Sequence, residues 1–113
     1  MVEADADAVR DAVLELGMED WIPLPEAVAT PEIRAATQGD RPTWLVLSAA
    51  LRGLLAEREI RLYRGRWDDE NPRELVDAEA RAVLGEECWY AFHPDDPDEE
   101  RISFVNVRNI RDA

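Results

Sequence analysis

Lysine is absent from this chain of 113 residues, so its 13 basic side chains are all arginines, and 26 acidic residues outnumber them to give a formal net charge of −13. A field of this sign opposes non-specific attraction to nucleic acid and to anionic membranes. The absence of lysine together with abundant alanine and arginine is typical of the coding bias of a high-GC bacterium, and acidity without lysine is also typical of a salt-adapted cytoplasm. Neither of these origins is a function.

Cysteine and long apolar runs are equally scarce. The single cysteine cannot form an intramolecular disulfide, which favours a reducing compartment, and the N-terminal residues lack the basic and apolar segments of a secretory signal. The longest apolar-rich run, Trp44 to Leu55, is shorter than the roughly 20 residues that span a bilayer. We therefore predict a cytoplasmic protein without membrane association that folds as a single domain over residues 1–113, alone or as a homodimer.

The sequence carries no set of residues typical of catalysis or of metal binding. Its only histidine, His93, has no second imidazole or paired thiol at ligand spacing, and residues 95–100 lack the glycine of a calcium loop. Cys88 and His93 could form a thiol–imidazole pair, which is the one enzymatic alternative. Cys88 also fits a buried small side chain, because it alternates with Tyr90 and Phe92. We predict no cofactor, no metal and no enzymatic activity.

Hydrophobic periodicity predicts a mixture of helices and strands. The predicted helices cover residues 4–16, ended by Gly17; residues 26–29; Pro31 to Thr37, capped by Thr30; Pro42 to Glu57, the central core helix; and Asp77 to Leu84, capped by Asp77 and ended by Gly85. The predicted extended segments cover residues 20–25, 60–67, 88–92 and 101–107, with a polar turn at 68–72 and an acidic loop at 93–100. Trp21, Trp44 and Trp89 are expected in the core.

This order of elements resembles the winged helix-turn-helix class, as seen in small acidic proteins of high-GC bacteria. The resemblance is carried by the helix-to-strand junction from Leu51 to Gly65, LRGLLAEREIRLYRG. It implies an α+β, winged-helix-like fold with three to five helices and a small antiparallel sheet, in which residues 93–100 form the wing. The wing of DNA-binding members is basic, whereas this loop has five acids before Arg101, so direct reading of duplex DNA is not expected.

Charge is segregated along the chain, because residues 41–67 hold six arginines and only two acids between two acidic flanks. Four of these arginines, with Tyr63 and Trp67 interleaved, are candidates for contact with an anion or a nucleic acid: Arg58, Arg61, Arg64 and Arg66. The simpler alternative is that they pair with flanking acids or protect an edge strand from aggregation.

The acidic flanks provide a second candidate surface, for a basic protein partner. Its residues are Trp67, Asp68, Asp69, Glu70, Asp95, Asp96, Asp98 and Glu99. Trp67 could be a contact anchor or a residue at the edge of the core, and the acids could serve only solvation. The leading hypothesis is a non-catalytic protein-binding domain, such as an inhibitor or immunity-type partner of a basic protein. The alternative is a transcription-associated winged-helix protein that binds nucleic acid through the arginines.

Overall fold

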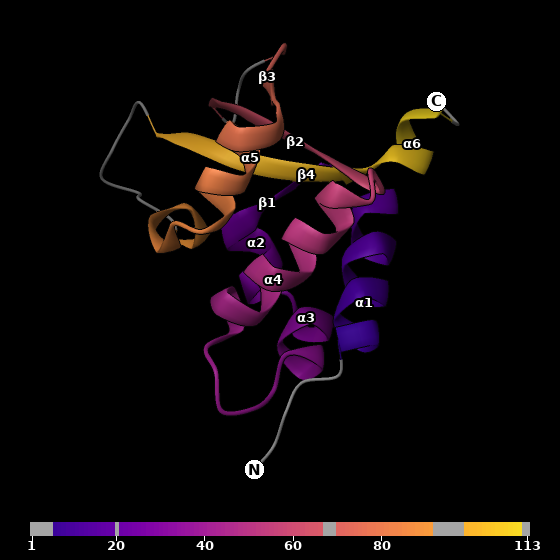
Figure 1. The fold of residues 1–113 in the computed structure, drawn as a ribbon, viewed down its shortest axis with the longest axis vertical. Coiled ribbons are helices and arrows are strands. Elements are labelled where there is room, and N and C mark those ends of the chain that lie inside the picture. The colour runs from indigo at the N-terminus through magenta and orange to yellow at the C-terminus, as the bar shows by residue number, and fades with distance from the viewer. Residues whose placement is uncertain (1–5, 20, 67–69, 92–98, 112–113) are drawn as a thin grey trace.

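The computed structural model of this chain describes residues 6–19, 21–66, 70–91 and 99–111, and it has the α+β architecture that the sequence predicts (Figure 1). The α-helices are α1 (Ala6–Glu19), α2 (Leu24–Ala29), α3 (Pro31–Ala36), α4 (Thr43–Ala56), α5 (Asp77–Leu84) and α6 (Val107–Arg111), and a 3₁₀ helix, η1, covers Glu87–Tyr90. The strands are β1 (Ile22–Pro23), β2 (Ile60–Arg66), β3 (Arg73–Leu75) and β4 (Glu100–Asn106).

The four strands form one antiparallel sheet in the order β1-β4-β2-β3. The two long strands, β2 and β4, lie at its centre and pair along their whole length, from Ile60 opposite Asn106 to Arg66 opposite Glu100. The short strands β1 and β3 flank them on either side. Segments about 40 residues apart in the sequence are therefore the closest neighbours in the sheet.

Helices cover one face of this sheet. In Figure 1, α1, α2 and α4 lie below the sheet, and each of them contacts β2 or β4. Along β2 the buried residues Ile60 and Leu62 alternate with the exposed Arg61, as expected of a strand with one covered face. Leu62 lies opposite Phe104 of β4, and both side chains are fully buried in the hydrophobic core.

Gly17 does not end the first helix, although its position predicts that role. Helix α1 continues to Glu19, and Gly17 is buried where the helix crosses β4. A Cβ at this position would lie 2.8 Å from the backbone nitrogen of Asn106, and the Asn106 side-chain amide donates a hydrogen bond to the Leu14 carbonyl oxygen at 3.0 Å. The glycine is thus required by the close approach of helix and strand.

The strand predicted at residues 88–92 is wrong. Residues Glu87–Tyr90 form η1, in which Tyr90 is buried while Cys88 is exposed, so Cys88 is not the buried small side chain that alternation suggested. Cys88 and Tyr90 are two residues apart, which is the spacing of side chains on one face of a strand. So short a segment can equally form one turn of 3₁₀ helix, in which these two side chains point in different directions. Phe92, the third residue of the predicted strand face, lies outside the described residues.

Smaller corrections concern helix ends, short elements and one tryptophan. Thr30 does not cap α3 with its side chain, because its hydroxyl donates to the Glu26 carbonyl oxygen instead. Asp77 was predicted to cap α5, but it is the first residue of that helix and Val76 is the capping residue. Strand β3 and helix α6 were not predicted, and α6 raises the helices to six. Trp21 is 39% exposed and stacks on Tyr63 of β2 with 4.2 Å between ring centroids, outside the core.

Candidate functional site

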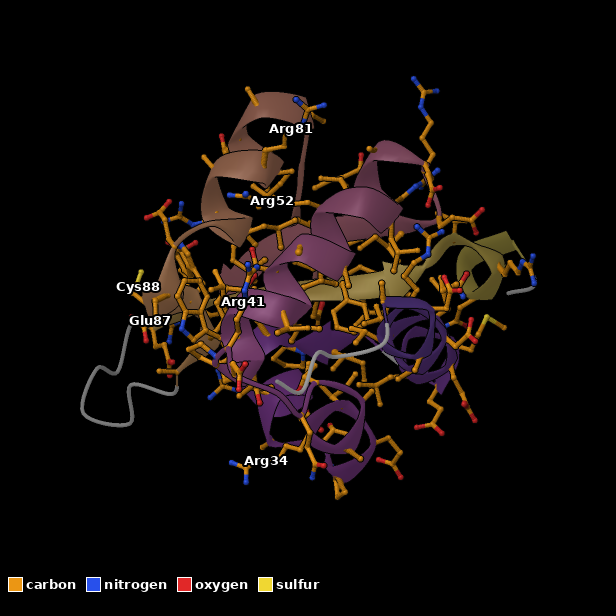
Figure 2. All side chains as sticks on the ribbon, turned by 60° about the horizontal axis from the view of Figure 1, so that its bottom comes forward. Arg34, Arg41, Arg52, Arg81, Glu87 and Cys88 are labelled. Carbon is orange, nitrogen blue, oxygen red and sulfur yellow. The ribbon has the colours of Figure 1, made fainter. Side chains whose placement is uncertain are left out.

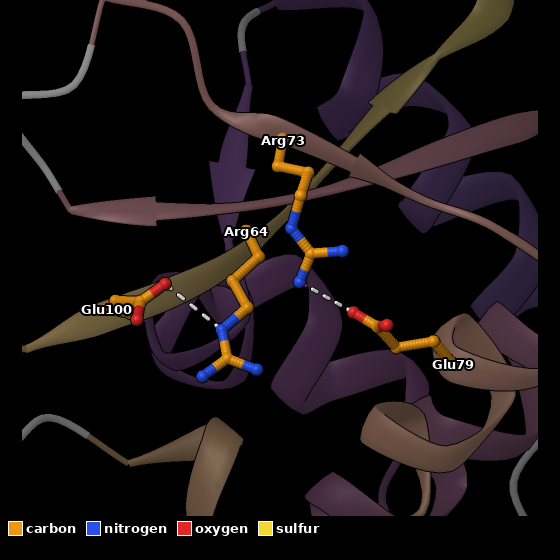
Figure 3. A network of polar contacts seen from close by, with 4 residues as sticks. All are labelled: Arg64, Arg73, Glu79 and Glu100. Atoms are coloured by element: carbon orange, nitrogen blue, oxygen red, sulfur yellow. Dashed lines mark hydrogen bonds and ion pairs between the residues drawn. The ribbon is translucent and has the colours of Figure 1, made fainter.

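The arginines of β2 divide between the two faces of the sheet, because successive side chains of a strand point in opposite directions. Arg61 and Arg64 therefore cannot contact the same partner through one flat surface. Each has a carboxylate on a neighbouring strand: Arg61 Nε lies 3.6 Å from Glu74 of β3, and Arg64 Nε donates to Glu100 of β4 at 3.0 Å (Figure 3). The sequence left two interpretations of these arginines, contact with an anion or pairing with acids of the same chain. At Arg61 and Arg64 the structure shows pairing within the chain.

Further contacts hold the Arg64 region together. The guanidinium carbon of Arg64 lies 4.9 Å from the centre of the Trp89 ring, which is a cation–π distance. Nearby, Arg73 of β3 donates to Glu79 of α5 at 2.7 Å (Figure 3). That hydrogen bond and the charge of Glu79 raise the pKa of Arg73 above its usual value. These contacts join strands to one another and to α5, so they serve the fold.

The other two predicted arginines lie at the ends of β2. Arg58 is exposed in the turn between α4 and β2, where its φ of 60° places it in the left-handed region. Arg66 is exposed at the far end of the strand, opposite Glu100 in the register. The four predicted arginines therefore do not form one contact surface.

Most residues of the predicted acidic surface lie outside the described residues: Trp67, Asp68, Asp69, Asp95, Asp96 and Asp98. Glu70 is exposed. Glu99 Oε2 lies 3.6 Å from Nη2 of Arg101, and its side chain is only 11% exposed, so a partner would find little of it. His93, the proposed partner of Cys88 in a thiol–imidazole pair, also lies outside the described residues.

A different set of arginines lies on the helical side of the molecule: Arg34 of α3, Arg41 just before α4, Arg52 of α4 and Arg81 of α5. We call this set the helical arginine face. Figure 2 shows the four labelled side chains one below another, from Arg81 on α5 at the top to Arg34 on α3 at the bottom. All four are exposed, and among the described residues none of the four forms an ion pair with a carboxylate.

The outer surface of α4 forms the middle of this face. Leu45, Ala49 and Arg52 are exposed at helical spacing, and Arg41 lies just before the helix begins at Thr43. Leu45 is 40% exposed, which is unusual in a helix whose opposite stripe includes the fully buried Leu47. The helix thus presents apolar surface beside Arg52.

The Arg52 side chain lies against the end of α5. Its guanidinium lies over Gly85, and a Cβ on Gly85 would overlap its Nη2 atom. A cation at this position is favourable because the last carbonyl oxygens of a helix carry partial negative charge. Gly85 has a φ of −90°, which any residue adopts, so the missing side chain leaves room for Arg52 rather than serving a backbone turn.

Two buried hydroxyl groups, one from α4 and one from η1, hold the same helix end. Ser48 Oγ donates to the Leu84 carbonyl oxygen at 2.5 Å, and the Tyr90 hydroxyl donates to the same oxygen at 2.7 Å. Burial raises the pKa of Tyr90 to about 12, although its hydrogen bonding with Ser48 and the charge of Arg52 oppose the rise. The scaffold under the helical arginine face is therefore a satisfied, buried network.

The helical arginine face was not predicted as a site. The spacing of Leu45, Ala49 and Arg52 could have shown that they share the side of α4 away from Leu47 and Leu51. No local pattern places Arg34 and Arg81 on the same side, because their relation depends on how three helices pack. That they form no ion pair with a described carboxylate is likewise invisible in a sequence with two acids for every arginine.

The fold and this surface define an α+β domain with an exposed cationic and apolar helix face. Within the described ranges, no group of three His, Cys, Asp or Glu side chains is arranged to hold a metal ion, and no helix is long and apolar enough to cross a membrane. No protein-family model matches the chain, and neither a curated protein nor a solved structure matches it.

Proposed function

We propose that this chain is a non-catalytic, cytoplasmic protein-binding domain of winged-helix-like arrangement, and that the helical arginine face is its contact surface. The proposal is carried by one observation: four exposed arginines of this face form no ion pair with a described carboxylate, in a chain with twice as many acids as arginines. Elsewhere Arg10, Arg61, Arg64 and Arg73 all have carboxylates within 4 Å.

The chemistry of the face favours a protein partner over a nucleic acid. Interfaces between proteins are enriched in arginine and exclude water from apolar contacts, and Leu45 with Ala49 provides such a contact beside Arg52. Neither residue can donate a hydrogen bond to a base edge. The net charge of −13 also opposes approach to a polyanion over long distances.

Photo-crosslinking in cells of the source organism tests this proposal. A photoreactive amino acid placed at Ala49, which is exposed on α4, should give a discrete crosslinked protein. The same amino acid at Glu15, exposed on α1, is the matched control and should not. Replacing Arg41 and Arg52 together by serine should remove the crosslink. If Ala49 captures no protein that Glu15 does not also capture, the proposal is wrong.

Nucleic-acid binding is the second candidate, and one arrangement favours it. Helices α3 and α4 precede β2, and β4 lies between β1 and β2, which is the order expected of a winged helix in which α4 would be the recognition helix. Crosslinking of the Ala49 variant to nucleic acid rather than protein would support this candidate. Loss of that product on replacing Arg41, but not Arg61, would locate the contact.

The predicted basic partner, bound through the acidic flanks, stays a prediction. Glu70 is the exposed acid of that set within the described residues. Co-purification at low salt, followed by release at raised ionic strength, would support it if replacement of Asp95, Asp96 and Asp98 by asparagine removed the partner while the Arg41 and Arg52 double variant retained it.

A further inference from the structure

We infer that Arg64 of β2, Arg73 of β3 and Trp89 of η1 form a binding site for a phosphate group. We call these three residues the Arg64–Arg73 site. The site shares no residue with the helical arginine face, so the inference goes beyond the proposed function and does not depend on it. It combines three observations: two arginines on neighbouring strands, N–H groups that their ion pairs leave unused, and a buried indole N–H without an acceptor.

The two arginines of the site lie directly opposite each other on neighbouring strands. Their side chains therefore leave the sheet on the same face, as Figure 3 shows. Like charges at opposite positions of a strand pair repel each other. Glu100 contacts Arg64 and Glu79 contacts Arg73, so each arginine has one carboxylate. A phosphate group, which carries nearly two negative charges at neutral pH, would reduce the remaining repulsion between the arginines.

The ion pairs within the chain leave most of the arginine donors unused. A guanidinium has N–H groups on three nitrogens, and Glu100 accepts only from Nε of Arg64, whereas Glu79 accepts only from Nη2 of Arg73. Within the described ranges, the terminal nitrogens of Arg64 and the Nε of Arg73 donate to no acceptor. Two such N–H groups can donate in parallel to two phosphate oxygens, so pairing within the chain is compatible with phosphate binding.

Trp89 provides a third donor beside the arginines. Its ring centre lies 4.9 Å from Cζ of Arg64, and its Nε1 is buried without a hydrogen-bond partner among the described residues. Buried N–H groups of proteins nearly always have an acceptor in the protein, in water or in a ligand. Because the flexible Arg64 side chain lies over the same ring, we expect a shift of this side chain to admit an oxygen to the N–H. A phosphate group has enough oxygens to accept from both arginines and the indole, whereas a carboxylate has two.

Titration of the full chain with inorganic phosphate at constant ionic strength, followed by heteronuclear NMR, tests the inference. The indole N–H signal of Trp89, identified by its loss in Trp89→Phe, should move downfield and saturate as phosphate replaces chloride. Arg64→Ala and Arg73→Ala should each raise the dissociation constant by about tenfold, because each removes charge-assisted hydrogen bonds. Glu79→Gln removes a carboxylate that competes for Arg73 and should lower the constant. Acetate, with two oxygens, should bind more weakly than phosphate.

The matched controls lie on the opposite face of the same two strands. Arg61→Ala and Glu74→Gln break an ion pair of the same kind and should leave the dissociation constant for phosphate unchanged. Circular dichroism of each variant checks that the fold is retained. If Arg64→Ala does not fold, Glu79→Gln, which keeps every arginine, decides the question.

Three results would overturn the inference: a Trp89 signal that does not saturate with phosphate, equal phosphate binding by the Arg64→Ala and Arg61→Ala variants, or an unchanged dissociation constant in Glu79→Gln. Acetate that binds as tightly as phosphate would also contradict it, because the site would then select no phosphate group. The proposed function is tested separately, since the crosslink at Ala49 involves no residue of the Arg64–Arg73 site.

Discussion

The arginines of β2 and those of the helical arginine face lie in different surroundings. In the sheet, the pairing of strands places Glu74 beside Arg61 and Glu100 beside Arg64, so opposite charges meet across neighbouring strands. On the helices, Leu45 and Ala49 adjoin Arg52, and no such pairing follows from the backbone. Of the arginine-rich stretch 41–67, Arg61 and Arg64 are thus paired with carboxylates in the sheet, whereas Arg41 and Arg52 form no ion pair with a described carboxylate.

The largest difference between the two regions should be in the packing beneath them. Leu62 of β2 is fully buried and Leu45 of α4 is 40% exposed, so they form a matched pair of leucines. Leu62→Ala should lower the free energy of unfolding by about 2–5 kcal/mol because it leaves a cavity in the core. Leu45→Ala should change it by less than about 0.5 kcal/mol. Urea denaturation measures both, and similar losses would contradict the comparison.

A pH titration should show how far the buried network under the helical arginine face contributes to stability. Because burial raises the pKa of Tyr90 to about 12, the folded state holds a proton that an unfolded tyrosine releases near pH 10. Its contribution is therefore complete below pH 10 and is lost as the pH rises toward 12, by up to about 2–3 kcal/mol.

Denaturation between pH 8 and pH 12 checks this expectation, with Tyr90→Phe as control. The variant loses a hydrogen bond to Leu84, worth about 1 kcal/mol, and should also lose the steep decline above pH 10. An unchanged decline in the variant would assign the pH dependence to other groups.

A double-mutant cycle on Arg64 and Glu100 should give a smaller value. The side chains are 33% and 45% exposed, so solvent screening limits the coupling to about 0.5–1 kcal/mol, and added salt should reduce it. Arg64→Ala should cost somewhat more than Glu100→Ala, because it also removes the contact with the Trp89 ring. Zero coupling would mean that the sheet arginines are no more engaged than the helical ones.

The smallest effects are expected at the helical arginine face itself. Arg34→Ala and Arg81→Ala should each change the free energy of unfolding by less than about 0.5 kcal/mol, because neither side chain has a described carboxylate partner. Thermal or urea denaturation measures this change. A loss above about 1 kcal/mol would show a structural role and would remove that arginine from the proposed contact surface.

Elements with long, regular periodicity could be predicted well from the sequence. The central helix was expected from Pro42 to Glu57 and is Thr43–Ala56, and the strand expected at residues 60–67 is Ile60–Arg66. Short elements were predicted poorly, because three or four residues do not distinguish a strand from a 3₁₀ turn, as at Glu87–Tyr90. Strand β3 forms because it pairs with β2, which no local pattern indicates.

The α+β class, the core stripe of α4 and the exposure of Arg52 follow from local periodicity and could be inferred from the order of residues. The pairing of Arg64 with Glu100, the requirement for Gly17 beside Asn106 and the absence of a described carboxylate partner at the four helical arginines depend on distances between segments far apart in the chain. Ion pairing requires a contact of a few ångströms between side chains, and only the packing of strands and helices sets which of the 26 acids come that close to an arginine.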